Sequence, residues 1–270
     1  MIPRHRLHLV RRYASTGLLA LCGLSVVGLI WQLTAWASDP SQVPAPSDVW
    51  RSLIEDWHSI PALSYLEFQS GGIAAAAAFS TAHVVAGVAV GAAVGVPVGI
   101  TIARVRLARL LLVPPLSLLG TLPLLVLLPF ITLWFGTAAF AQSGLVTLFA
   151  LLTVAFASES AALAVSDAYA NYASSLGASH RRILWTVVLP AAAPTIVGAV
   201  RVALAAGWGW EAIAELLGAH AGVGRVIDVT ARLGAVSDLT ATVLCLAVIA
   251  LLCDAAVAGA GRVLCRWRPL

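Results

Sequence analysis

The sequence contains no lysine, and all 16 of its basic residues are arginine. This absence excludes the P-loop lysine of the G-x-x-x-x-G-K-[ST] motif and any Schiff-base lysine. Charged residues make up only 10% of the 270 residues, whereas a soluble domain carries about 25%. So little charge cannot cover a water-exposed surface, which excludes an ordinary soluble enzyme and a disordered or fibrous chain. We expect no catalytic residue and no cofactor in this chain, and any ATP used must be bound by another chain.

Cysteine pairs of the kind that bind metals are also missing. The cysteines are Cys22, Cys245, Cys253 and Cys265, and none forms a C-x-x-C pair. Three of them lie in or beside apolar runs, where a cysteine acts as a small apolar side chain. We therefore predict no metal or redox site.

What the sequence does contain is long apolar runs, with 60% hydrophobic residues and a mean hydropathy of +0.95. Runs of about 20 apolar residues are long enough to span a bilayer. We predict an all-α polytopic membrane protein with about six transmembrane helices: 14–37, 73–103, 110–135, 142–165, 192–217 and 239–263. The fifth run contains Arg201, Glu211 and Glu215, so five spans remain the alternative if it is re-entrant. The third run contains four prolines, which predict a kinked or broken helix.

The distribution of arginine supports this topology. With the N-terminus in the cytoplasm, 12 of the 16 arginines fall inside, three fall outside and Arg201 lies within a span. This asymmetry satisfies the positive-inside rule for a chain with both termini in the cytoplasm. Arg4 to Arg12 followed by an apolar run and Ala35-Trp36-Ala37 also outlines a signal peptide, but the length of the run favours a retained helix.

These patterns divide the chain into five parts. They are a cytoplasmic N-terminus (1–13), a first transmembrane helix (14–37), an outer loop with an interfacial helix (38–72), a core transmembrane domain (73–263) and a cytoplasmic C-terminus (264–270). In the outer loop, Ser47-Asp48 is expected to cap the interfacial helix. The core contains a long cytoplasmic loop, 165–190, in which Ser179 is expected to cap a short helix after Gly177.

Small residues recur every four positions in the second run, at Gly87, Gly91, Gly95 and Gly99. They lie on nearly one face of a helix and allow another helix to approach closely. We predict tight helix packing there, either within the bundle or across a dimer.

The segment 171–190 reads NYASSLGASHRRILWTVVLP. Its spacing resembles the EAA signature of the permease subunits of type I ATP-binding-cassette importers: E-A-A, three residues, glycine, nine residues, isoleucine, any residue and Leu-Pro. Ala173 and Gly177 match, Val187 replaces the isoleucine, and Leu189-Pro190 close the pattern. Asn171 and Tyr172 replace the first two signature residues. In this family the segment docks on the ATPase, which implies docking residues Asn171, Tyr172, Ala173, Leu176, Gly177, Ala178, Ser179, Arg181, Arg182, Leu189 and Pro190.

The resemblance covers about 43–260 and is closest to the nitrate, sulfonate and taurine branch of these permeases. It rests on VPAPSDVW (43–50), LPLLVLLPFITLWFG (122–136), VLPAAAPTIVGAVRVALAAGWGWEAIAELLG (188–218) and AGVG (221–224). It implies a permease of the bacterial cytoplasmic (inner) membrane that works by alternating access. The implied substrate is nitrate, a sulfonate, taurine or a heteroaromatic vitamin precursor.

The implied partners are a second permease subunit, which makes a homodimer or a heterodimer, and two cytoplasmic ATPase subunits that hold ATP and magnesium. An extracytoplasmic substrate-binding protein and the lipid bilayer complete the set, and no nucleic acid is expected.

Ionisable and aromatic residues within the spans are the candidates for the transport pathway, because such residues are costly in a membrane. They are Trp134, Glu159, Arg201, Trp208, Glu211 and Glu215. Arg201 can also be structural and pair with a carboxylate, and the tryptophans can form an aromatic belt. Two alternatives for the whole chain remain open: a self-contained secondary transporter or channel, and a membrane scaffold for an ATPase that does not itself transport.

Overall fold

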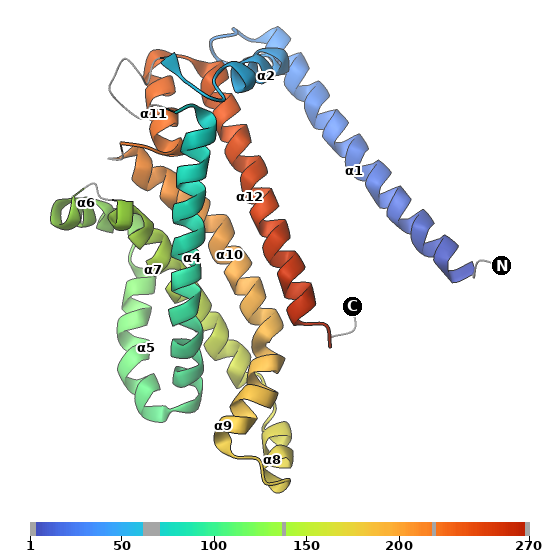
Figure 1. Ribbon diagram of the computed structural model, residues 1–270, viewed down its shortest axis with the longest axis vertical. Coiled ribbons are helices and arrows are strands. Elements are labelled where there is room, and N and C mark those ends of the chain that lie inside the picture. Colours follow the sequence, from blue (N-terminus) through green and yellow to red (C-terminus); the bar gives the residue numbers. More distant parts are fainter. Residues whose placement is uncertain (1–3, 62–70, 137–138, 218–219, 268–270) are drawn as a thin grey trace.

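The computed structural model describes residues 4–61, 71–136, 139–217 and 220–267, which form an extended bundle of helices (Figure 1). Among these residues, five helices are long and apolar enough to cross a membrane, and a bent pair of helices brings the number to six if the pair is counted as one span. The five are α1 (Arg4–Ala37), α4 (Ile73–Arg104), α7 (Ala139–Leu163), α10 (Leu189–Leu216) and α12 (Val236–Leu264). The bent pair is α5 (Arg106–Thr121) and α6 (Leu124–Phe135). The predicted all-α fold with about six spans is therefore confirmed.

The break predicted in the third span lies between α5 and α6, whose axes differ by 90°. Leu122 takes an extended conformation (ψ 134°) in front of Pro123, because a proline disfavours the helical conformation of the residue before it. Pro114, Pro115 and Pro129 are accommodated inside the two helices. The alternative of a re-entrant fifth run is wrong, since α10 is one continuous helix.

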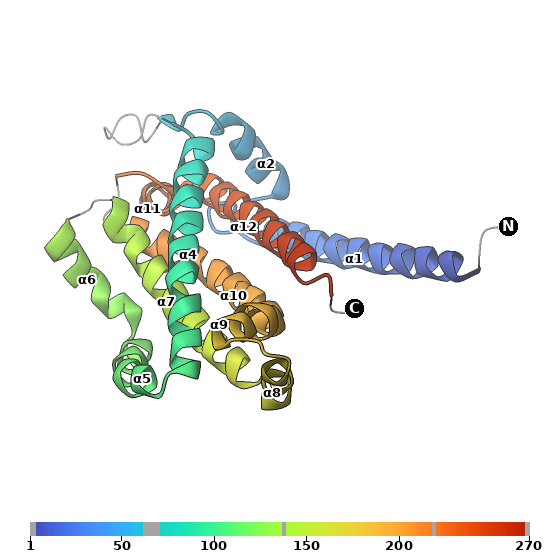
Figure 2. The same ribbon diagram turned by 60° about the horizontal axis from the view of Figure 1, so that its bottom comes forward.

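The centre of the bundle is formed by α4, α7 and α10, which lie side by side in Figures 1 and 2. Buried valines of α4 and α7 meet Leu204 of α10 in one apolar core. The four glycines of α4 face α7: a Cβ atom at Gly91 would lie 2.6 Å from the Cβ atom of Ala150. The predicted tight packing is therefore confirmed, and it occurs within the bundle.

A second apolar core lies at the end of the bundle where α4 begins. It brings together α2 (Pro46–Glu55), α11 (Val223–Leu233) and the first half of α12. The predicted cap of α2 at Ser47-Asp48 is wrong. The N-cap is Ala45, and Pro46 occupies the first turn. A proline is tolerated there because the backbone N–H groups of the first turn have no partner within the helix. Helix α11 was not predicted from the sequence.

The first span stands apart from the rest of the chain (Figures 1 and 2). Its described leucines, such as Leu19 and Leu24, are exposed. At its end, the indole N–H of Trp31 donates a hydrogen bond to the carbonyl of Pro44 over 3.0 Å. This contact fixes the end of α1 beside α2, while the apolar surface of α1 is left to the bilayer or a partner.

The arginines gather at one end of the bundle. The turn between α4 and α5 carries Arg104, Arg106 and Arg109, and the connection from α7 to α10 carries Arg181 and Arg182. Both connections lie at the bottom of Figure 1, opposite α2 and α11. We call this end of the bundle the arginine-rich end, and it corresponds to the predicted cytoplasmic side.

The contact between α2 and α12 is expected to depend on pH. Asp56, the residue that follows α2, interacts electrostatically with Asp238 in the first turn of α12. Burial, helped by the charges of Asp238 and Glu55, raises the pKa of Asp56 to about 6. The folded carboxyl therefore holds its proton more tightly than the unfolded one, so this contact stabilises the fold at low pH and weakens as the pH rises through 6.

We expect the amides of α2 to exchange with deuterium more slowly at pH 5 than at pH 7.5, after correction for intrinsic rates. Asp56→Asn should remove this difference, because the amide does not titrate. Asp48→Asn, the matched change in the first turn of the same helix, should keep it. Equal corrected protection of the unmodified protein at the two pH values would contradict the expectation.

Candidate functional site

Two short helices connect α7 to α10 at the arginine-rich end (Figure 1). They are α8 (Asp167–Ser175) and α9 (His180–Ile183). The hydroxyl of Ser166 accepts a hydrogen bond from the backbone N–H of Ala168, and that of Ser179 accepts one from the N–H of Arg182. The predicted cap at Ser179 is therefore confirmed. Both helices begin with a serine that satisfies a free backbone donor.

The turn between α8 and α9 requires a glycine. Gly177 has a φ of +82°, a conformation that a side chain makes unfavourable. The N–H of Gly177 bonds to the carbonyl of Ser174 over 2.9 Å, and the N–H of Ala178 bonds to that of Ala173 over 3.1 Å. These two bonds form a Schellman motif, which closes the end of α8. The glycine of the signature thus sets the angle between the two helices.

Three large side chains on α8 and its end are exposed. Tyr169, Tyr172 and Leu176 expose 67%, 69% and 72% of their surface. Their spacing of three and four residues places them on one helix face, which we call the docking face. An exposed apolar patch of this kind, outside the spans, suits contact with another protein.

The other residues of the signature lie around this face. Asn171, Gly177 and Ser179 are exposed, and Ala173 and Ala178 are half-buried. Arg181 and Arg182 are exposed on α9, and Asp167 provides an acidic side chain in the first turn of α8. Leu189 and Pro190, also half-buried, begin α10. The structure therefore brings the sequence-predicted docking residues into one element.

This element continues into the fifth span without a break. After α9 the chain forms a π-helical turn, η1 (Leu184–Val188), in which the N–H of Leu189 bonds to the carbonyl of Leu184. Pro190 follows and has no N–H to donate, which explains why the regular pattern is interrupted at this point. Helices α9 and α10 are therefore joined through η1 into one helical rod.

Of the pathway candidates, Arg201 lies on an exposed face of the bundle and is paired with a carboxylate. Its Nε and Nη2 atoms donate hydrogen bonds to Oδ1 and Oδ2 of Asp254 on α12, over 2.7 and 2.6 Å. The two side chains are 45% and 34% exposed. A bidentate pair of this kind carries no net charge, which lowers the cost of placing it within a membrane.

Small residues surround Arg201 on the exposed face of α10. This face, the α10 face, consists of Thr195, Gly198, Arg201, Val202, Ala205 and Gly209, all of which are exposed. Their spacing of three to four residues places them in one stripe along the helix. Small side chains favour close approach of another helix within a membrane. The α10 face therefore suits contact with a further helix.

Glu159 and Trp134 lie elsewhere on the bundle. Glu159 on α7 is half-buried, and its Oε1 lies 3.8 Å from Nε of Arg109 at the arginine-rich end. Trp134 on α6 is exposed, and the centroid of its ring lies 5.9 Å from that of Phe130. The structure does not bring these two residues to the α10 face.

The remaining candidates are inside the bundle. Glu211 and Glu215 are fully buried, and Trp208 is 6% exposed. Glu215 accepts hydrogen bonds from the Ser80 hydroxyl over 2.6 Å and from the N–H of Gly224 over 2.8 Å. Glu215 thus links α10 to α4 and to the beginning of α11. The spacing of four residues between Glu211 and Glu215 predicted that both lie on one face of α10. It could not show that this face points into the bundle.

Sequence reasoning did not identify the partners of these groups. Asp254 was not connected with Arg201, and neither Ser80 nor His83 was connected with the glutamates. All three lie on helices distant in sequence from α10. No local spacing rule connects them with their partners on α10. The only available signal was that each is a polar residue in a long apolar run.

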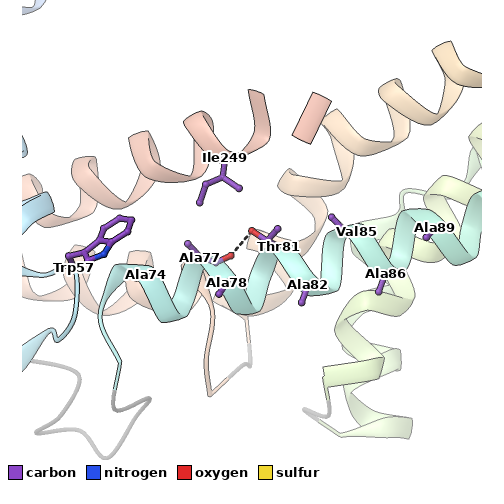
Figure 3. A pocket seen from close by; sticks show the side chains of 10 residues that line it. All are labelled: Trp57, Ala74, Ala77, Ala78, Thr81, Ala82, Val85, Ala86, Ala89 and Ile249. Atoms are coloured by element: carbon purple, nitrogen blue, oxygen red, sulfur yellow. Dashed lines mark hydrogen bonds between the residues drawn. The ribbon is translucent and has the colours of Figure 1, made fainter. Parts of the chain in front are cut away.

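A cavity of about 700 Å³ lies between the start of α4 and α12. Figure 3 shows that alanines of α4 form one wall, and that Trp57 and Ile249 face them. The hydroxyl of Thr81 donates its hydrogen to the carbonyl of Ala77 over 2.6 Å, so it is not available as a donor to the cavity. The cavity offers small apolar side chains and no cluster of charges, which fits helix or lipid packing better than chemistry.

Comparison with known proteins agrees with these features. The family described as "Binding-protein-dependent transport system inner membrane component" matches residues 95–267. The taurine transport system permease protein TauC of Escherichia coli (strain K12) is 30% identical over 154 residues, covering 57% of this chain and 56% of that protein. A putative aliphatic sulfonates transport permease protein, SsuC of Bacillus subtilis (strain 168), is 30% identical over 155 residues, with the same coverage. The chain therefore spans little more than half the length of the curated relatives it matches.

A solved structure has a similar fold. A chain from an inward-facing structure of the MetNI methionine ABC transporter superposes with a TM-score of 0.60 at 23% identity. The match covers 70% of this chain and 94% of the other. At this identity the likeness concerns the fold alone.

Proposed function

Because this chain belongs to the family of binding-protein-dependent transport system inner membrane components, we propose that it is the permease subunit of an ATP-driven importer. Membership confirms the predicted class, a multi-pass inner-membrane component of a transport system that is not itself an enzyme. The proposal adds the assembly: two permease subunits, two cytoplasmic ATPase subunits that bind ATP and magnesium, and an extracytoplasmic binding protein.

The docking face is the observation that carries this proposal. Tyr169, Tyr172 and Leu176 project from a short helix whose two flanking connections lead into transmembrane helices. Aromatic and leucine side chains on a rigid element are well suited to fill a groove on a partner protein. The turn at Gly177 and the continuous rod from α9 to α10 give a rigid route by which ATPase movement reaches the bundle.

The α10 face supports contact with a second permease subunit. Its small residues permit close packing, and its paired Arg201 and Asp254 avoid lipid if that face meets another protein. We infer that the transported solute passes along this face, between the two subunits. On this proposal Arg201 is the pathway residue, whereas Glu211, Glu215 and Trp208 support the pathway from within the bundle.

The names of the similar permeases suggest the first substrates to test. TauC is named for taurine and SsuC for aliphatic sulfonates. We propose a small organic sulfonate for this chain, consistent with a cationic side chain on the α10 face. Because Asp254 neutralises Arg201 in the present geometry, the sulfonate would bind where this pair opens.

Reconstitution of the complete complex tests the proposal. The tagged chain would be purified in mild detergent with its ATPase and binding protein, then placed in proteoliposomes with radiolabelled taurine or an alkanesulfonate. We expect the ATPase and the binding protein to co-purify with the chain. Uptake should require ATP on the side of the membrane where the ATPase lies. Uptake without ATP and without an ATPase would show a secondary transporter, and a stable ATPase complex that moves no solute would show a scaffold.

A further inference from the structure

Three metal-ligating side chains meet inside the bundle, away from the arginine-rich end. They are His83 on α4 and Glu211 and Glu215, one turn apart on α10. One ligand atom from each lies within 4.8 Å of the other two. Both glutamates are fully buried, whereas the side chain of His83 is 19% exposed. The two carboxylates are therefore shielded from solvent, and His83 is the part of the cluster that solvent reaches.

The two carboxylates have very different partners. Glu215 is held by the Ser80 hydroxyl and the N–H of Gly224. In the part of the chain that the structure describes, neither carboxylate oxygen of Glu211 has a hydrogen-bond partner. Its Oε1 lies 3.1 Å from Nδ1 of His83, and that nitrogen also lacks a hydrogen bond. An unpartnered buried carboxylate is costly, so Glu211 calls for a further group.

With both carboxylates ionised, the charge of the cluster is compatible with a bound cation. Among the described residues, no arginine forms an ion pair with Glu211 or Glu215; the cationic candidate beside them is His83. A protonated His83 would supply one positive charge against two negative ones. A divalent cation bound to a neutral imidazole and two carboxylates would balance the charge completely. Burial favours the neutral combination, because unbalanced charge within a protein is strongly penalised.

We propose that His83, Glu211 and Glu215 bind a divalent transition-metal ion of the zinc type. One imidazole nitrogen and two carboxylate oxygens form a three-ligand set, which zinc accepts together with a fourth ligand such as water. Metal–ligand bonds of about 2.1 Å place tetrahedral ligands about 3.4 Å apart. Nδ1 of His83 and Oε1 of Glu211, which are 3.1 Å apart, lie close to this spacing, and the ligand atoms of all three side chains lie within 4.8 Å of one another.

The surroundings of the cluster support the same assignment. The ring of Phe79 packs edge-on against His83, with the ring centroids 4.2 Å apart, so the imidazole is held in one orientation. Glu215 is positioned by its two hydrogen-bond donors, as ligating carboxylates commonly are. The bound ion would join α4 to α10 and, through Glu215, to the beginning of α11. It is a structural clamp at the outer end of the bundle, separate from the docking face.

Metal binding can be measured directly on the full chain in nanodiscs. After treatment with a chelator and its removal, Zn²⁺ and Mn²⁺ would each be titrated and the retained metal counted per chain. We expect one Zn²⁺ per chain and a rise in the unfolding temperature on saturation. Glu211→Gln keeps the size of the side chain but removes its charge, and it should weaken Zn²⁺ binding at least 100-fold and abolish the thermal shift.

Glu159→Gln is the matched control, because it makes the same carboxylate-to-amide change in a membrane helix outside the cluster. It should bind Zn²⁺ as the unmodified protein does. If Glu211→Gln is not recovered folded, His83→Gln provides the second test and should show the same loss. No stoichiometric Zn²⁺ in the unmodified protein, or equal binding by the cluster variants, would overturn the proposal and indicate a proton shared among these side chains instead.

Discussion

Gly91→Ala is expected to destabilise the bundle by about 3 kcal/mol, the upper part of the range for overpacking a core. A methyl group at this position would lie 2.6 Å from Cβ of Ala150, 2.7 Å from the carbonyl oxygen of Thr147 and 2.9 Å from the backbone nitrogen of Leu151. Two of these three atoms belong to the backbone of α7, so no rotation of a side chain relieves the contact. The helices α4 and α7 must separate instead, and the valines packed beside them lose contact.

The measurement is thermal unfolding of the protein in nanodiscs, together with the yield of monodisperse protein. Gly144→Ala on α7 is the control, because a Cβ atom there meets nothing within 4 Å. That substitution should leave stability unchanged or raise it slightly, since alanine favours a helix over glycine by about 1 kcal/mol. An unfolding temperature of Gly91→Ala equal to that of the control would mean that the two helices are not in the close contact described.

Leu176→Asp is expected to separate the permease from its ATPase and to reduce ATP-driven uptake at least 100-fold. Leu176 is the most exposed of the three residues of the docking face. Burying an aspartate in an apolar groove removes the leucine contact and leaves a charge without a partner, a loss of about 3 kcal/mol or more at an interface hot spot. Such a loss corresponds to a reduction in affinity of more than 100-fold.

Ser174→Asp provides the control for the added charge. Ser174 is exposed on the same helix but lies on a different face from Tyr172 and Leu176. It should retain the ATPase on a pull-down, and both variants should insert into the membrane to the same extent because neither residue is in a span. Full retention of the ATPase by Leu176→Asp would contradict the docking role of α8.

The sequence predicted most features that follow from local rules. The span lengths follow from apolar runs, the break near Pro123 from the chemistry of proline, and the turn at Gly177 from the signature spacing. The start of α2 was misplaced because Ser47 and Asp48 are good caps, whereas Pro46 sets the backbone of the first turn before them. Helix α11 was missed because a short amphipathic segment between two spans has no apolar run to reveal it.

Features that depend on how the helices are rotated could not be predicted. The stripe from Gly87 to Gly99 showed that some helix must lie close, but not that the helix is α7. Likewise, Glu211 and Arg201 both lie on α10, and no local rule distinguishes the buried position from the exposed one. Only the neighbours on α4 and α12 decide this, and each was far away in the sequence.

The pairing of Arg201 with Asp254 has a consequence for the biosynthesis of the protein. Translation delivers α10 to the membrane before α12, since chains emerge from the N-terminus. Until α12 arrives, Arg201 is an unneutralised cation in an apolar segment, which costs about 3 kcal/mol at the centre of a bilayer. Synthesis of α12 removes this cost, because the Asp254 carboxylate then accepts hydrogen bonds from Nε and Nη2 of Arg201. The last span therefore completes the insertion of an earlier one, so a chain released before α12 is made keeps α10 poorly anchored and open to membrane quality control.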